Sequence, residues 1–260
     1  MKILFVGDIV GKPGRQALKE WLPVLRDKHG LDAVVVNGEN AAGGLGVTPK
    51  LLDEVLALKV DAVTLGNHTW RKKELVAAID SYSTVVRPAN YPADVPGKGS
   101  VLIPTAAGYS LAVVNLIGRV YMDPVDCPFV RGRAEVERLR ERTPLVLVDF
   151  HAEATAEKVA MGWHLDGQCT AVVGTHTHIP TADDRVLPGG TAYITDVGMT
   201  GPMDSVIGME RERVLHRFLT GMPVEFRVAN ERPVLCGVVI EADHESGMAT
   251  SIERVMCGAD

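Results

Sequence analysis

The chain carries at residues 3–8 the stretch Ile-Leu-Phe-Val-Gly-Asp, in which a short apolar run is followed by a carboxylate. Four further runs rich in Val, Ile and Leu, at residues 33–36, 62–65, 145–148 and 171–173, are likewise followed by polar residues. Such runs are typical of the buried strands of an α/β sheet. Residues that bind metals or transfer protons follow them: Asp8, Glu39, Asn67, His68, His151, His176 and His178. Because ligands bind beyond the carboxyl ends of such strands, we expect these residues to meet in one cleft.

The segments between the first runs carry helical signals. Residues 14–29 repeat apolar side chains at helical spacing, and Gly30 supplies a stop. Thr48 and Pro49 form an N-cap and a favoured first residue for a second helix. Alternating strands and helices predict an α/β fold built from β-α-β units.

Further elements are expected along the rest of the chain. They are strands at residues 100–103, 111–116 and 191–195, helices at 133–142, 152–164 and 208–219, and a hairpin of 234–242 with 249–256. Two irregular loops, residues 41–46 and 195–204, follow predicted strands, so either can border the cleft and move over a substrate. No linker or repeat interrupts the pattern, and we expect a single domain over residues 1–260.

The composition sets limits on the class of protein. Of the 260 residues, 46% are hydrophobic and 23% are charged, as in ordinary globular proteins. A formal net charge of -6 argues against a protein that coats nucleic acid, although a small nucleotide or an RNA end stays compatible. No stretch approaches the roughly 20 apolar residues of a membrane span. Asp8 comes too early for a signal peptide, so a cytoplasmic protein without a membrane partner is expected.

The cysteines suggest neither a disulfide framework nor a thiolate zinc site. Cys127, Cys169, Cys236 and Cys257 are scattered, without a Cys-x-x-Cys pair. We expect reduced and mostly buried thiols.

The polar residues after the strands form a mixed nitrogen and oxygen donor set. Carboxylates, amides and imidazoles together suit manganese, iron or zinc better than calcium, which prefers oxygen ligands alone. His176 and His178 lie past a strand end, where both rings can reach one cleft and serve two adjacent ions. Taken singly, Asp8 or Asn67 is as well explained as a turn or helix-cap residue, and His151 as a structural histidine. Their conjunction favours a metal site.

These residues fall into blocks that resemble the calcineurin-like metallophosphoesterases. The blocks are Gly7-Asp8, Gly38-Glu39-Asn40, Gly66-Asn67-His68, His151 and His176-Thr177-His178. The departures from the general pattern are Val10 in place of a ligating histidine, Glu39-Asn40 in place of an aspartate, and Thr175 between Gly174 and His176. With Gly-Glu-Asn-Ala-Ala-Gly-Gly at residues 38–44, these variations resemble the bacterial YmdB-type branch.

The resemblance implies a fold and an activity. The fold is a four-layer αββα sandwich of two mixed β-sheets flanked by helices. The activity is that of a two-metal phosphodiesterase, a phosphoric ester hydrolase, on cyclic nucleotides, with 2′,3′-cyclic nucleotides as the expected substrates. One metal is expected on Asp8, Glu39, Asn40 and His178, and the other on Glu39, Asn67, His151 and His176. Glu39 thus bridges the ions, for which iron or manganese is expected and zinc is a third candidate.

A mechanism follows as a hypothesis. Two ions roughly 3.5 to 4 Å apart can share a hydroxide that attacks phosphorus in line with the leaving oxygen. His68 has no assigned metal, and we expect it to protonate that oxygen as a general acid. Asp149 and Asp196 also follow predicted strands, so each is expected either to orient a metal-bound imidazole or to cap a helix. For Arg15, Arg71 and Lys72 a solvated surface charge is favoured over contact with substrate phosphate.

Two other functions stay open. A phosphomonoesterase or nucleotidase would use the same metals, because the cluster does not itself choose among phosphate esters. The second alternative is a regulatory protein that senses a nucleotide or an RNA end with slow turnover. His68 argues against this alternative, because binding alone needs no leaving-group acid. The oligomeric state is also open, since the apolar terminal hairpin offers an edge for a homo-oligomer.

Overall fold

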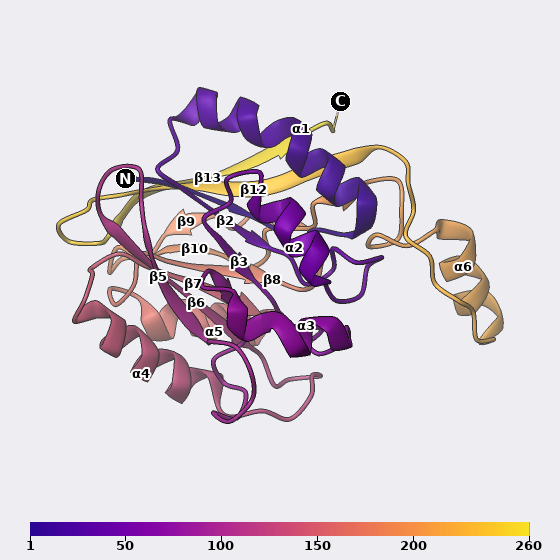
Figure 1. Cartoon of the computed structure of the whole chain (residues 1–260), viewed down its shortest axis with the longest axis horizontal. Coiled ribbons are helices and arrows are strands. Elements are labelled where there is room, and N and C mark those ends of the chain that lie inside the picture. Colours follow the sequence, from indigo (N-terminus) through magenta and orange to yellow (C-terminus); the bar gives the residue numbers. More distant parts are fainter. Residues whose placement is uncertain (260) are drawn as a thin grey trace.

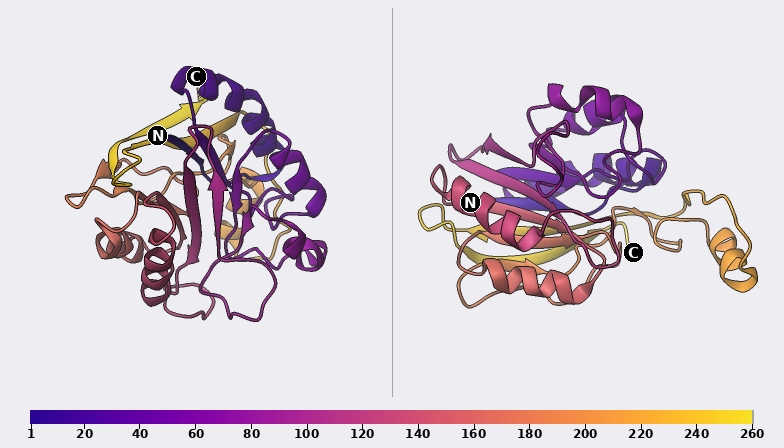
Figure 2. Two further views of the ribbon diagram at one scale, coloured as in Figure 1. Left: turned by 60° about the vertical axis from the view of Figure 1, so that its left-hand side comes forward. Right: turned by 90° about the horizontal axis from the view of Figure 1, so that it is seen from below.

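The computed structural model describes residues 1–259 and places two β-sheets face to face between layers of helices (Figures 1 and 2). The first sheet has the order β13, β12, β1, β2, β3, β4, with β11 paired to one end of β12. Strands β1 to β4 are parallel, whereas β12 is antiparallel to β1. The bounds are β1 Lys2–Val6, β2 Ala33–Asn37, β3 Ala62–Thr64, β4 Val85–Val86, β11 Gly201–Pro202, β12 Pro233–Ala242 and β13 Ala249–Cys257.

The second sheet is also mixed. Its order is β5, β6, β7, β8, β10, β9, with parallel pairing from β6 to β10 and antiparallel strands at both edges. The bounds are β5 Ser100–Pro104, β6 Ser110–Ile117, β7 Val146–His151, β8 Ala171–Thr175, β9 Arg185–Val186 and β10 Ala192–Ile194.

Helices cover the outer face of each sheet. The bounds are α1 Gly11–His29, α2 Pro49–Leu56, α3 Lys73–Ala78, η1 Ile79–Ser81, α4 Pro128–Arg140, α5 Thr155–Leu165 and α6 Arg211–Thr220. Leu18 and Leu52 of α1 and α2 pack on the first sheet, and Val136 and Met161 of α4 and α5 pack on the second. By contrast, α6 lies on a segment that projects from the sandwich, at the right of Figure 1.

The strands alternate their side chains between two cores, as the pleat of a strand requires. In β2, Val34 and Val36 face the helices, whereas Ala33 and Val35 face the second sheet. Both faces are apolar because both are covered, which explains the continuous apolar runs in the sequence. The four-layer sandwich of two mixed sheets is therefore confirmed.

The predicted helix boundaries were correct in part. Gly30 ends α1 with φ 63°, and the Thr48 hydroxyl accepts a hydrogen bond from the backbone N–H of Leu51 (3.4 Å), as predicted. Helix α4 begins earlier than predicted because Pro128 serves as its first residue. Helix α6 begins later than predicted because Gly208, with φ 101°, belongs to a preceding turn. Helix α3 and strands β4, β9 and β11 were missed, since they are too short to show a period.

Three smaller expectations can also be compared with the structure. The terminal hairpin of β12 and β13 is confirmed. All four cysteines are free thiols, with Cys169 and Cys236 buried and Cys127 and Cys257 half-buried. Within residues 1–259, no helix has the length and apolar character needed to cross a membrane.

Candidate metal centre

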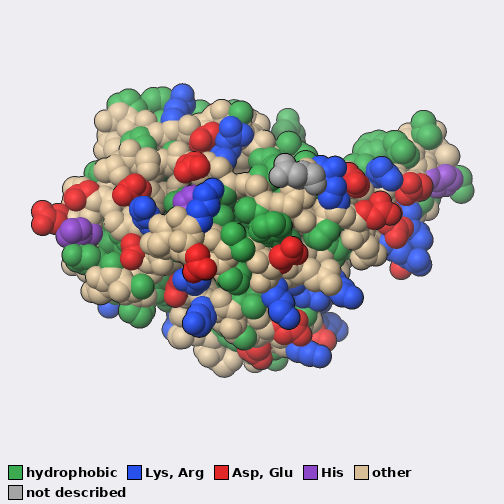
Figure 3. Space-filling view, turned by 90° about the horizontal axis from the view of Figure 1, so that it is seen from above, with side chains coloured by type: hydrophobic (Ala, Val, Ile, Leu, Met, Phe, Trp, Pro, Cys, Tyr) green, Lys and Arg blue, Asp and Glu red, His purple; other side chains and the backbone are tan. Residues whose placement is uncertain are grey.

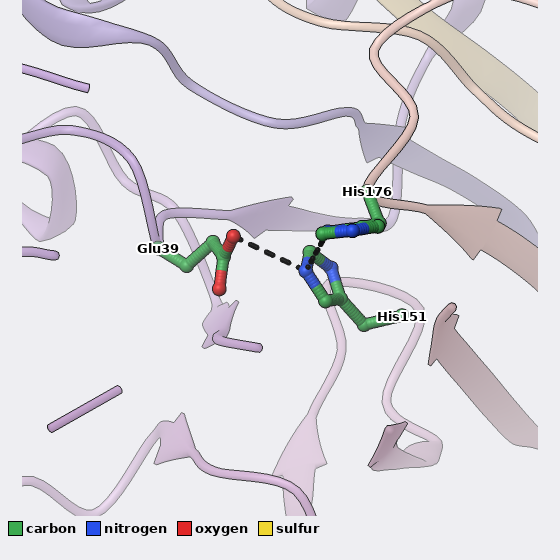
Figure 4. Close-up of side chains that lie close together, drawn as sticks. All are labelled: Glu39, His151 and His176. Carbon is green, nitrogen blue, oxygen red and sulfur yellow. Dashed lines mark hydrogen bonds and ion pairs between the residues drawn. The ribbon is translucent and has the colours of Figure 1, made fainter. Parts of the chain in front are cut away.

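Side chains at the carboxyl ends of β2, β7 and β8 converge between the two sheets. Glu39, His151 and His176 offer ligand atoms that all lie within 4.8 Å of one another (Figure 4). Asp8, after β1, is fully buried beside them, and its Oδ2 accepts a hydrogen bond from the backbone N–H of His176 (3.1 Å). The cleft predicted from the strand ends is thus present.

Glu39 occupies the middle of this cluster. Its Oε1 lies 3.1 Å from Nε2 of His151 and 3.2 Å from Nδ1 of His68. Its Oε2 accepts the backbone N–H of His68 (2.9 Å). A Cβ on Gly66 would collide with this carboxylate and with the His151 ring. The glycine of the Gly66-Asn67-His68 block is therefore required by the close packing of the cluster.

One ring nitrogen of His151 has more neighbours than it can satisfy. Its Nε2 lies 2.9 Å from Oδ1 of Asn67 and 3.0 Å from Nδ1 of His176, in addition to Glu39. A single nitrogen carries at most one proton, so these contacts cannot all be hydrogen bonds. A cation among them would be coordinated by the carboxylate, the amide oxygen and both rings. These residues therefore fit one of the two predicted cations.

The other ring nitrogen of His151 is held by a chain of two hydrogen bonds, through Thr175 to Asp149. The Thr175 hydroxyl donates to Oδ1 of Asp149 (2.7 Å), so it accepts from Nδ1 of His151 (2.9 Å). This arrangement leaves Nε2 to face the cluster. Asp149 also accepts from Thr64 and Asn37, and it caps no helix among the described residues. Of its two predicted roles, the structure supports the orientation of an imidazole, acting through Thr175.

A second group of potential ligands surrounds one carboxylate oxygen of Asp8. Oδ1 of Asp8 is buried and has no hydrogen-bond partner among residues 1–259. It lies 3.7 Å from Nε2 of His178, whose Nδ1 donates to the carbonyl of Ile207 (2.9 Å). A buried carboxylate oxygen without donors is costly unless a cation binds it. Asp8 and His178 therefore fit the other predicted cation.

Asn40 lies between the two groups. Its Nδ2 is 3.1 Å from Oε1 of Glu39 and 3.2 Å from Nε2 of His178, while its Oδ1 is 2.7 Å from Nδ1 of His68. In this orientation the amide holds His68. A rotation of the amide by half a turn would present its oxygen to the cation beside Asp8 and His178.

The loop that carries His176 and His178 is strained. Both residues have positive φ values, 98° and 68°, which non-glycine residues rarely adopt. Oδ2 of Asp196 accepts the backbone N–H (3.1 Å) and the hydroxyl (2.7 Å) of Thr177 between them. The same oxygen accepts from Nζ of Lys158 (2.6 Å), which is only 1% exposed. Asp196 thus fixes the loop that carries His176 and His178. The role of Lys158 could not be predicted from the sequence, because its partner Asp196 lies 38 residues away.

The charges of the cluster shift its pKa values. Burial opposes the charged form of His151, but the carboxylates of Glu39 and Asp8 outweigh it and raise its pKa to about 9. Burial opposes ionisation of Glu39, yet the imidazoles of His151 and His68 lower its pKa well below the usual range. Burial raises the pKa of Asp8 despite His178 and His151. Burial and the charge on His151 lower the pKa of His176 to about 3.

Two cavities flank the cluster. One of about 470 Å³ is lined by residues of the cluster, including Glu39, His68 and His178, and by six apolar side chains between Val206 and Phe226. Another of about 320 Å³ is lined by Asn67, Arg71, Tyr121, Met122, Asp123 and His176. Arg71 therefore borders the centre, whereas Arg15 contacts the carbonyl of Ala41 and lies 3.7 Å from Glu54. Gly44 and Leu45 line the larger cavity as predicted, but the loop of residues 195–204 packs behind the site.

The fold and the site together define an α/β protein of the metallophosphoesterase type. Residues 4–255 match the family model described as YmdB-like protein, and the chain belongs to this family. The family predicted from the sequence is confirmed.

Its relatives match along nearly their whole length. The 2′,3′-cyclic-nucleotide 2′-phosphodiesterase of Bacillus subtilis (strain 168) is 50% identical, over 100% of this chain and 98% of the relative. The crystal structure of a hypothetical protein from Thermus thermophilus superposes with a TM-score of 0.91 at 44% identity, over 98% of each chain. That of a novel phosphatase from Mycoplasma pneumoniae gives a TM-score of 0.90 at 36% identity, over 98% of this chain and 92% of that one.

Proposed function

We propose that this protein is a phosphodiesterase that hydrolyses 2′,3′-cyclic nucleotides with two bound cations. The observation that carries the proposal is the buried cluster of Glu39, His151 and His176 beside the orphaned oxygen of Asp8. The Bacillus subtilis relative, which is 50% identical, is named for this activity. The class of enzyme expected from the sequence, a phosphoric ester hydrolase, agrees with that relative and with the Mycoplasma pneumoniae phosphatase.

The proposed ligand sets keep the assignment made from the sequence. One cation is held by Asp8, Glu39, Asn40 and His178, and the other by Glu39, Asn67, His151 and His176. Imidazole, amide and carboxylate donors suit iron or manganese, with zinc as a third candidate. When bound, a pair of such cations activates water and neutralises phosphate charge.

His68 supplies the proton for the leaving oxygen. Its Nδ1 faces the side-chain amide of Asn40, 2.7 Å from Oδ1 in this structure, and lies near Oε1 of Glu39 (3.2 Å). Either orientation of the amide occupies this ring nitrogen. The second nitrogen of the ring is therefore the one available to substrate in the larger cavity, which His68 lines. We assign His68 as the general acid that protonates the ribose 2′ oxygen.

Two alternatives use the same residues. A phosphomonoesterase or nucleotidase would bind a terminal phosphate at the cluster, and a sensor of nucleotides or RNA ends would bind with slow turnover. Because His68 is held in place beside the cluster, we favour catalysis over sensing. The cytoplasmic location, the single domain and the homo-oligomer stay predictions.

The test is hydrolysis of 2′,3′-cyclic AMP by manganese-loaded protein, with Glu39→Gln prepared in parallel and its metal content measured. Turnover by the wild type, with loss of both metal and turnover in Glu39→Gln, would support the proposal. Hydrolysis of 3′-AMP without hydrolysis of the cyclic ester would favour the monoesterase. Binding of either nucleotide without turnover would favour the sensor, and an active, fully metallated Glu39→Gln protein would refute the bridging role.

A further inference from the structure

The larger cavity beside the metal centre has a second, apolar wall. Opposite Glu39, His68 and His178 lie side chains from the projecting segment that carries α6. They are Val206, Ile207, Met209, Val214, Phe218 and Phe226. Figure 3 shows that hydrophobic side chains remain exposed on this segment, at the right of the view. The cavity is therefore lined both by polar residues of the proposed metal centre and by an apolar, partly aromatic wall from the projecting segment.

A hydrogen bond connects this apolar wall to the proposed metal centre. The carbonyl of Ile207 accepts a hydrogen bond from Nδ1 of His178 (2.9 Å), so the wall and a proposed ligand share a contact. The guanidinium of Arg217 lies over the ring of Phe226, 5.3 Å from its centroid, and fixes that ring from one side. The position of the wall is thus set relative to the cluster.

We propose that the apolar wall is the nucleobase subsite, with the base of the substrate packed against Phe226 and Phe218. The inference rests on the proposed function. Since His68 protonates the ribose oxygen, the ribose and its base extend to the side of the cluster that His68 lines. His68 borders the cavity of about 470 Å³ and does not border the cavity of about 320 Å³. The base therefore enters the larger cavity, whose volume suits a small-molecule ligand.

The chemistry of the wall sets its selectivity. Aromatic and aliphatic side chains offer stacking and burial but no donors or acceptors that read the edge of a base. The subsite therefore discriminates nucleotides from phosphate esters without a base, and it discriminates weakly among the four bases.

The test compares two ligands that differ only in the base. Binding of 3′-AMP and of the 3′-phosphate of 1-O-methylribose to manganese-loaded protein is measured by calorimetry. We expect the wild type to bind 3′-AMP about tenfold or more tightly than the abasic phosphate, as stacking of one base on an aromatic ring provides. Phe226→Ala and Phe218→Ala should lose most of this preference with unchanged affinity for the abasic phosphate, whereas Phe226→Trp should keep it.

The matched control is Leu219→Ala. Leu219 is 83% exposed on the same helix but does not line the cavity, so its removal should leave both affinities unchanged. Phe218 is 81% exposed, and its replacement should therefore leave the fold intact. Equal affinity of the wild type for the two ligands, no binding of 3′-AMP, or an equal loss of both affinities in the phenylalanine variants would overturn the subsite. Because no turnover is measured, failure of the proposed phosphodiesterase activity would be seen separately.

Discussion

The amide oxygen of Asn40 lies 2.7 Å from Nδ1 of His68, so the residue after the proposed bridging carboxylate holds the proposed general acid. Asn40 also reaches Nε2 of His178 through its amide nitrogen, at 3.2 Å. A single side chain therefore links the proton donor to the proposed ligands. The departure from the general motif at Glu39-Asn40 has a structural consequence, because Asn40 adds an amide that contacts both rings beside the carboxylate of Glu39.

Replacement of His68 should separate metal binding from catalysis. We expect His68→Ala to keep both cations, because His68 is in neither proposed ligand set, while kcat on 2′,3′-cyclic AMP falls by about 10²- to 10⁴-fold. Metal content and kcat would be measured on the same preparation. A 4-nitrophenyl ester, whose leaving group needs little protonation, should lose much less rate. An undiminished rate on the cyclic nucleotide would remove His68 from this role.

Removal of metal should destabilise the protein. Oδ1 of Asp8 is buried and has no hydrogen-bond partner among residues 1–259, and the carboxylate of Glu39 lies close enough to disfavour its charge. Chelation should lower the thermal midpoint, and excess manganese should restore it, since a ligand at about 100 times its Kd stabilises by about 2.7 kcal/mol. Asp8→Asn is the matched comparison, because its shape is kept while its charge is lost. It should bind less metal and show a smaller shift, and equal shifts would argue against Asp8 as a ligand.

The metal-free protein should have a stability optimum in pH. The pKa of His151 is raised from 6.5 to about 9, so its contribution to stability is complete below pH 6.5 and is lost as the pH rises through 9. The pKa of His176 is lowered to about 3, so its contribution is complete above pH 6.5 and is lost as the pH falls towards 3. Urea denaturation in chelator should therefore show the highest stability near pH 6.5 from these two groups. In His151→Asn the decline between pH 6.5 and 9 should disappear, and its persistence would assign that decline to another group.

The ion pair behind the metal centre should matter more than those on the surface. Lys158→Met leaves Asp196 buried without its cation, and loss of one partner of a buried pair costs about 3 to 5 kcal/mol. Arg133→Met is the control, because Arg133 and Glu137 form an exposed pair worth at most about 1 kcal/mol. Urea denaturation would measure both. We also expect Lys158→Met to bind metal more weakly, because Asp196 holds Thr177 between two proposed ligands, and unchanged metal affinity would exclude that coupling.

Much of the site could be predicted because its signals are local. A strand buried on both faces must be apolar along its length, so the runs before Asp8, Glu39 and Asn67 stand out without any knowledge of the fold. The polar residues that follow these runs lie at the strand ends simply because they come next in the chain. Within each sheet, parallel strands bring those ends to one edge. The two edges meet only because the sheets pack face to face, which places Glu39 of the first sheet 3.1 Å from His151 of the second.

By itself, the sequence determined the α/β class, the blocks of proposed ligands and their family, because these depend on residue type and short spacing. Only the tertiary structure decided which partners hold those residues: Thr175 and Asp149 behind His151, Lys158 and Asp196 behind the loop of His176, and the carbonyl of Ile207 on His178. These contacts join segments that are distant in sequence and meet only in the folded chain, so no local pattern encodes them. The apolar wall from the projecting segment has the same origin, since Phe218 and Phe226 acquire their proposed role only by lining the same cavity as the cluster.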